Sequence, residues 1–176
     1  MRKYRLAMWL AAVTVVSGAP SQSLLAQKFE VVTGKAFDSA VPKDFYLEGN
    51  AIPTEKRNAI LVKTPSGARA LFALIDTAGY SSNIVSKYVG MVITEGDVTL
   101  CGHKIPVGSY GFGWALPATG VDAPGKFSLY NQAGAPVADC TAERHADLKQ
   151  PRPLQVIVAP DGSARLYHGK NYIGLQ

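Results

Sequence analysis

The feature that most constrains the fold is a repeated alternation between short apolar runs and turn-forming residues. The runs recur every 8 to 14 residues from Phe45 onwards. Three separators, Pro65-Ser66-Gly67, Gln132-Ala133-Gly134 and Pro160-Asp161-Gly162, end in glycine, which accepts the positive φ that tight turns require. This rhythm is typical of antiparallel sandwiches and barrels. We therefore predict an all-β protein, an antiparallel β-sandwich or open barrel of about eight to ten strands.

The expected strands are the β-rich runs on either side of these turns. They cover residues 29–33, 58–64, 68–76, 88–94, 98–102, 109–114, 126–131, 137–142, 154–159 and 163–168. Some runs are almost entirely apolar, such as Gln155-Val156-Ile157-Val158, and others alternate, so we expect two packed sheets whose central strands are the most buried. One short helix is predicted over residues 81–88, with a serine as its N-cap. A fourth turn, Glu95-Gly96-Asp97, is expected to join two of the runs as a hairpin.

The first 26 residues have the three-part layout of a secretory signal peptide. A basic start, Met1 to Arg5, precedes the apolar run Leu6 to Val16, and small and polar residues follow up to Ala26. The apolar run is too short to span a bilayer as a stable anchor. We expect cleavage after Ala26, with Ser21 as the alternative, and export to the periplasm or the extracellular medium. The mature chain is then a loose N-terminal arm (27–43) and a single β-sandwich domain (44–176).

The charge and hydropathy of the chain argue against two classes of partner. Removing the leader removes three basic residues and no acid, so the formal charge falls from +5 to +2. The remaining bases are scattered singly or in pairs such as Lys56-Arg57, whereas a nucleic-acid-binding face needs clustered lysine and arginine. No later stretch is long and apolar enough to span a membrane. The sequence thus predicts no nucleic-acid partner and no membrane span.

Two cysteines follow the leader, Cys101 and Cys140. In an oxidising compartment an isolated pair of this kind is most often a disulfide, and that is the prediction. A metal site is one alternative, because His103 and His145 lie near the two cysteines in the sequence, and free thiols are another. Structural zinc sites usually have more closely spaced ligand pairs, so we predict no metal and no cofactor.

The run Leu71 to Ser86, LFALIDTAGYSSNIVS, contains the candidate catalytic residue Asp76. An apolar strand that leads into Asp-Thr resembles the active-site strand of retroviral-type aspartic proteases, in which the two carboxylates of a dimer share a proton and activate a water. That family has Gly directly after Asp-Thr, whereas this chain has Ala78 there and Gly79 one position later. The resemblance implies a dimeric hydrolase that uses Asp76. The residues themselves also fit a turn that the Asp76 side chain caps.

The strand Ser109 to Trp114 alternates aromatic and small residues. Tyr110, Phe112 and Trp114 point to one side, and the serine and two glycines point to the other. The aromatic side is either the core face of a central strand or a platform on which a sugar or an apolar ligand stacks, with Trp114 expected to be the most exposed of the three. The glycine side allows a neighbouring sheet or the short helix to approach closely.

The segment Val98 to Tyr110, VTLCGHKIPVGSY, resembles part of an uncharacterised family of secreted bacterial β-domains. That resemblance implies an exported β-fold and no particular chemistry. The Gly-x-Ser-x-Gly elbow, the complete Gly-x-x-x-x-Gly-Lys-Ser/Thr phosphate loop and the His-Glu-x-x-His zinc helix are absent from the sequence. We therefore expect a non-catalytic protein that binds a small molecule, a glycan or an envelope protein, with Tyr110, Phe112 and Trp114 as candidate ligand contacts. An aspartic hydrolase that uses Asp76 is the alternative.

Overall fold

The computed structural model describes residues 28–117 and 123–176. The predicted signal peptide, residues 1–26, lies outside the described residues. Within the described ranges, no helix has the length and apolar character needed to cross a membrane.

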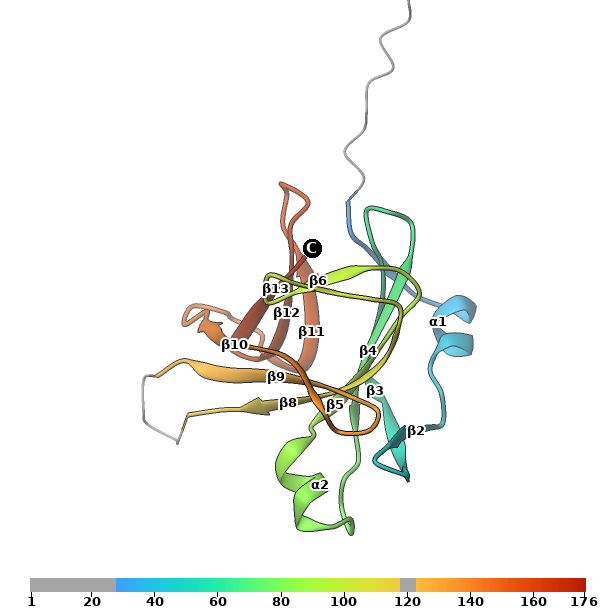
Figure 1. The fold of residues 1–176 in the computed structure, drawn as a ribbon. Coiled ribbons are helices and arrows are strands. Elements are labelled where there is room, and N and C mark those ends of the chain that lie inside the picture. The colour runs from blue at the N-terminus through green and yellow to red at the C-terminus, as the bar shows by residue number, and fades with distance from the viewer. Residues whose placement is uncertain (1–27, 118–122) are drawn as a thin grey trace, which may run out of the picture.

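The described chain is built mainly of antiparallel strands, which confirms the predicted all-β class (Figure 1). Two short helices accompany the strands, α1 (Lys35–Ala40) and α2 (Ser82–Lys87). The thirteen strands are β1 (Glu30–Val32), β2 (Asp44–Leu47), β3 (Asn50–Lys63), β4 (Arg69–Ile75), β5 (Gly90–Thr94), β6 (Val98–Leu100), β7 (His103–Ile105), β8 (Gly108–Ala115), β9 (Gly125–Asn131), β10 (Pro136–Arg144), β11 (Arg152–Val158), β12 (Ala164–Gly169) and β13 (Asn171–Leu175).

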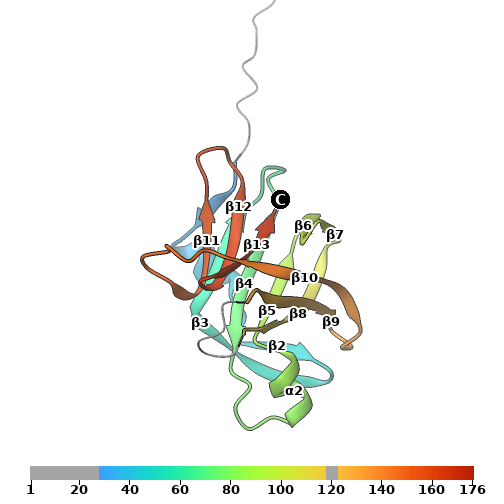
Figure 2. The same cartoon turned by 90° about the vertical axis from the view of Figure 1, so that its left-hand side faces the viewer.

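The main sheet curls into a nearly closed barrel. Its strands follow one another through backbone hydrogen bonds in the order β1-β3-β4-β5-β8-β9-β10-β13-β12-β11. The last strand, β11, lies next to β3, close to where the sheet began (Figure 2). Within the described residues, β3 and β11 share no backbone ladder, so the barrel has one open junction, which we call the seam. β2 pairs with β3 away from this path, and the β6–β7 hairpin pairs with β13.

Two hydrophobic cores follow from the alternation of side chains along the central strands. Phe72 on β4 belongs to an interior core that includes Phe112 on β8 and Phe127 on β9. Leu71 and Ala73, its neighbours in the sequence, point outward and pack in a second core with residues of β2, β3 and α2. β4 is therefore buried on both faces, which explains its almost unbroken apolar sequence.

The three glycine-ended turns join strands as predicted. Pro65-Ser66-Gly67 joins β3 to β4, Gln132-Ala133-Gly134 joins β9 to β10, and Pro160-Asp161-Gly162 joins β11 to β12. Their glycines have φ values of 89°, 85° and 87°. The fourth predicted hairpin, at Glu95-Gly96-Asp97, is wrong. Both edges of β5 are already occupied by β4 and β8, so β6 turns away and pairs with β7 and β13 instead.

Several elements are not predicted from the sequence, and they raise the number of strands above the expected eight to ten. β2 and the first half of β3 form a hairpin, β7 is a three-residue strand, and β13 follows the tight turn at Gly169-Lys170. The N-terminal arm contains the expected edge strand, β1, and an unpredicted helix, α1. The predicted helix is confirmed as α2, and its N-cap is Ser81, whose Oγ accepts a hydrogen bond from the backbone N–H of Ile84 at 3.4 Å.

A disulfide between Cys101 and Cys140 confirms the predicted pairing. Cys101 lies in the turn between β6 and β7, and Cys140 lies in β10. The bridge ties the β6–β7 hairpin, whose Ile105 belongs to the interior core, to the wall of the barrel. Because the two sulfurs are bonded to each other, they are not available to the alternative metal site. No group of three metal-ligating side chains occurs in the part of the chain that the structure describes.

Candidate functional site

The aromatic strand is β8, and its three aromatic side chains lie in the interior core. Tyr110, Phe112 and Trp114 are 8%, 0% and 5% exposed. The ring of Phe127 on β9 packs against Phe112 at a centroid distance of 5.7 Å and against Trp114 at 5.3 Å. The structure therefore favours the core interpretation of this strand, and these three rings are not presented to solvent as a stacking platform.

The expectation that Trp114 is the most exposed of the three aromatic residues is wrong. In addition to Phe127, its ring contacts His168 on β12 at a centroid distance of 5.6 Å. His168 is itself half-buried, and its Nδ1 lies 2.6 Å from the carbonyl oxygen of Pro153. A strand from a distant part of the chain thus covers the end of β8 that the sequence alone leaves open.

The opposite side of β8 confirms the predicted close approach of the helix. A Cβ atom at Gly111 would lie 2.6 Å from the ring of Tyr88, and one at Gly113 would lie 2.3 Å from the carbonyl oxygen of Lys87. Lys87 is the last residue of α2, and Tyr88 is its C-cap. The bare face of β8 therefore lets the end of α2 lie directly on the sheet.

Asp76, the candidate catalytic residue, is exposed just after the end of β4. Its Oδ1 accepts a hydrogen bond from the backbone N–H of Ala78 at 3.0 Å, and its own N–H donates to the carbonyl oxygen of Pro53 at 2.9 Å. The side chain thus caps the turn that leads to α2, which is the turn interpretation made from the sequence.

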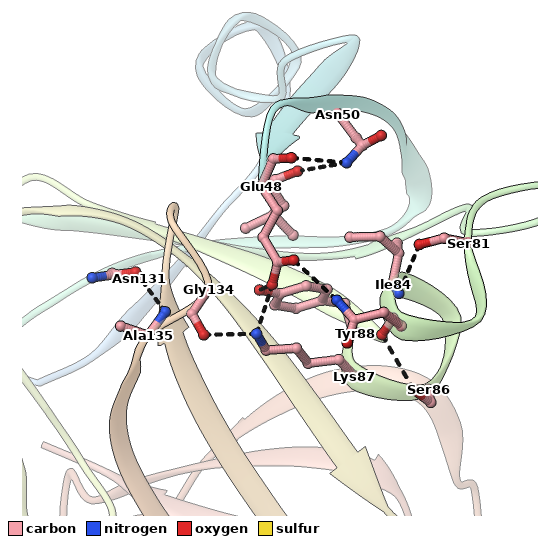
Figure 3. Close-up of polar contacts among 12 residues, drawn as sticks. Glu48, Asn50, Ser81, Ile84, Ser86, Lys87, Tyr88, Asn131, Gly134 and Ala135 are labelled. Carbon is pink, nitrogen blue, oxygen red and sulfur yellow. Dashed lines mark hydrogen bonds and ion pairs between the residues drawn. The ribbon is translucent and has the colours of Figure 1, made fainter.

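A polar cluster joins three segments that lie far apart in the sequence (Figure 3). We call it the Glu48 cluster: Glu48, Asn83, Lys87, Tyr88 and Gly134. Glu48 Oε1 accepts hydrogen bonds from Lys87 Nζ at 2.6 Å and Tyr88 Oη at 2.7 Å. Glu48 Oε2 accepts one from Asn83 Nδ2 at 3.0 Å, and Lys87 Nζ also donates to the carbonyl oxygen of Gly134 at 2.6 Å. The cluster fastens the β2–β3 turn and the β9–β10 turn to α2.

The charges of the Glu48 cluster are compensated within it. The side chains of Glu48 and Lys87 are 22% and 21% exposed, so their ion pair is largely shielded from water. The hydrogen bonds from Lys87 and then from Tyr88 lower the pKa of Glu48. Burial, followed by the hydrogen bond to Glu48, raises the pKa of Tyr88. A carboxylate that already has three donors is suited to holding segments together, so we interpret the cluster as structural.

Replacing Glu48 with Gln is expected to lower the free energy of unfolding near neutral pH by roughly 2 kcal/mol, because Lys87 keeps its charge and loses its carboxylate partner. The native pKa of Glu48 lies below its ordinary value of 4.5. The stabilisation is therefore fully present above that ordinary value and is lost as the pH falls through the lowered native value. Urea unfolding of both proteins at neutral and at acidic pH measures the difference, which should shrink in acid. A difference that is the same at both pH values would contradict this account.

The candidate ligand site is a groove of about 480 Å³ at the seam. We call it the seam groove. Its lining comes from β1, α1, β3 and β11, and it is apolar with several basic and polar side chains. The lining residues are Val31, Val32, Thr33, Phe37, Lys56, Arg57, Ala59, Ile60, Arg152, Gln155 and Val156. None of these described lining residues is acidic.

A bulge in β3 shapes one wall of the seam groove. The pairing of β3 with β4 shifts register between Glu55 and Ala59, so residues 56–58 have no partners on β4. In a regular strand, neighbouring side chains point to opposite faces. The consecutive residues Lys56 and Arg57 both line the groove, because the bulge interrupts that alternation.

The other wall of the seam groove is β11. The almost entirely apolar sequence of this strand predicts a buried central position, but the structure places it at the end of the sheet. Ile157 is 36% exposed and Val156 is half-buried, since the edge of β11 that faces β3 has no ladder partner. An apolar strand beside an open edge leaves apolar surface in the groove.

Three basic side chains line the seam groove. Lys56 forms an ion pair with Asp38 at 2.8 Å. Arg57 and Arg152 are exposed and have no acidic partner among the described residues. The groove thus combines apolar surface with two uncompensated positive charges.

Comparison with known proteins gives no relative, because no family profile, no curated protein and no solved structure matches this chain. The two family resemblances at residues 71–86 and 98–110 stay predictions.

The Glu48 cluster and the seam groove are not predicted from the sequence, since each is assembled from segments far apart in the chain. One signal was present in the sequence: the adjacent charged residues Lys56 and Arg57 break the alternation of polar and apolar side chains that a regular half-buried strand would show.

Proposed function

We propose that the protein is a non-catalytic binding protein and that the seam groove binds a small molecule with an apolar body. The observation that carries this proposal is the apolar surface left open where β3 and β11 fail to pair. The volume of the groove, about 480 Å³, is in the usual range for small-molecule sites, roughly 300 to 1,000 Å³. The groove replaces the β8 aromatic residues as the candidate ligand contact.

The proposal places the protein in an exported, oxidising compartment, the periplasm or the extracellular medium. The disulfide supports this placement, because disulfides persist mainly in oxidising environments. The proposal assigns no catalytic role. Asp76 is engaged with its own turn and is not among the residues that line the groove.

Binding of the uncharged apolar dye N-phenyl-1-naphthylamine tests the proposed function. The fluorescence of the dye is expected to rise and saturate with the unmodified protein. Val31→Glu places a charge on a wall residue that is 51% exposed, so folding should be retained while dye binding weakens. We expect a loss of about tenfold in affinity or more, because a charged side chain next to an apolar ligand is costly to desolvate.

The matched control is Val137→Glu, which makes the same change on β10 at a side chain that is 40% exposed and lies outside the groove. Its dye affinity should equal that of the unmodified protein. Absence of saturable dye binding would rule out the proposal. So would equal dye affinities for Val31→Glu and the unmodified protein.

A further inference from the structure

We propose that the seam groove binds a single-chain amphiphile with an anionic head group, and that Arg57 and Arg152 hold the head group. This inference rests on the proposed function, because it names the class of molecule that the groove takes. The two arginines come from opposite walls of the seam, Arg57 from the bulge in β3 and Arg152 from the start of β11. Both line the same groove.

The positive charge of the groove favours an anionic ligand. A guanidinium group is planar and binds a carboxylate, sulfate or phosphate through two parallel hydrogen bonds. Like charges that line one groove repel each other, and a bound anion relieves that repulsion. Lys56 is already paired with Asp38, so among the described lining residues the two arginines carry the uncompensated charge.

The largely apolar remainder of the lining favours an alkyl chain over a sugar as the body of the ligand. Apart from the basic residues, the polar side chains that line the groove are those of Thr33 and Gln155. A glycan needs many directed donors and acceptors, whereas a hydrocarbon chain needs only apolar contact. Val31, Val156 and Phe37 supply such contact along the groove.

Displacement of the bound dye by two molecules with the same chain length tests the inference. Decanoate carries a carboxylate head and decanol carries a neutral one. Decanoate is expected to displace the dye at a concentration about tenfold lower than decanol, a ratio that corresponds to one charge-assisted contact. Added salt should reduce this advantage, because the arginines are exposed and ions screen them.

Arg57→Gln and Arg152→Gln are each expected to weaken displacement by decanoate about threefold, because the two arginines share the tenfold advantage, and to leave decanol unchanged. The matched control is Arg165→Gln, which removes the same charge from an exposed arginine on β12 outside the groove. Arg165→Gln should change neither the displacement by decanoate nor the displacement by decanol. Binding to vesicles of anionic phospholipid distinguishes a membrane surface from a free amphiphile, and no vesicle binding is expected.

Equal displacement by decanoate and decanol would overturn the inference, as would arginine variants that behave like the unmodified protein. Vesicle binding without displacement by free decanoate would also overturn it. In each of these cases the proposed function would still stand, provided that the unmodified protein binds the dye and Val31→Glu weakens that binding. If the unmodified protein did not bind the dye, neither the inference nor the proposed function would stand. The salt titration uses the unmodified protein, so it decides the question even if an arginine variant does not fold.

Discussion

A double variant, Cys101→Ser with Cys140→Ser, is expected to unfold with a free energy about 4 kcal/mol lower than that of the oxidised protein. The bridge joins residues 39 positions apart, and this separation sets the chain entropy that the cross-link removes from the unfolded state. The loss should be concentrated at the β6–β7 hairpin, which the bridge ties to β10. Urea unfolding followed by far-ultraviolet circular dichroism measures it.

The matched control for the double variant is the unmodified protein with its disulfide reduced by dithiothreitol. It should unfold at nearly the same urea concentration as the double variant, because both lack the cross-link and serine differs from cysteine only by an oxygen in place of the sulfur. If the double variant were as stable as the oxidised protein, the bridge would contribute nothing to the fold. The tie between the hairpin and the barrel wall would then be unimportant for stability.

Gly113→Ala is expected to lower the free energy of unfolding by about 3 kcal/mol. The added Cβ would lie 2.3 Å from the carbonyl oxygen of Lys87. That oxygen belongs to the backbone at the end of α2, so no side-chain rotation relieves the clash and the helix must move off the sheet. The movement would also weaken the Glu48 cluster, because Lys87 carries the ammonium group of that cluster. Urea unfolding and the accompanying change in near-ultraviolet dichroism report both effects.

Gly174→Ala is the matched control for this substitution. Gly174 is also a strand glycine, on β13, but a Cβ at this position would meet nothing within 4 Å. Alanine there should leave the stability unchanged or raise it by about 0.5 kcal/mol, because it restricts the unfolded chain. Equal destabilisation by both substitutions would mean that strand glycines matter for their backbone alone and that contact with α2 is unimportant.

The features that the sequence predicts correctly are those encoded within a few neighbouring residues. The turn at Pro160-Asp161-Gly162 specifies its own dihedrals, and the alternation in β8 specifies a side that packs against α2. The pairing of Cys101 with Cys140 follows from there being two cysteines in the sequence. Each of these predictions needs no knowledge of what lies across the fold.

The features that the sequence does not predict depend on partners far along the chain. The burial of Trp114 depends on His168, and the corner at residues 95–97 depends on β5 having both edges already paired. The Glu48 cluster needs a β-turn, a helix end and a second turn to meet. The bulge in β3 is visible only as the charged pair Lys56-Arg57, and nothing in the local sequence says that Arg152 lines the same groove.

The unpaired junction between β3 and β11 has a consequence for the range of guests that the barrel tolerates. In the described residues the two strands are not joined by a ladder, so spreading them apart breaks no backbone hydrogen bond between them. The cost of admitting a thicker ligand is then the loss of side-chain packing along the seam, where Ile60 and Val156 pack against the interior core. A site of this kind discriminates poorly between ligands of different thickness. Under the proposal made above, selectivity would come from Arg57 and Arg152, which line the groove.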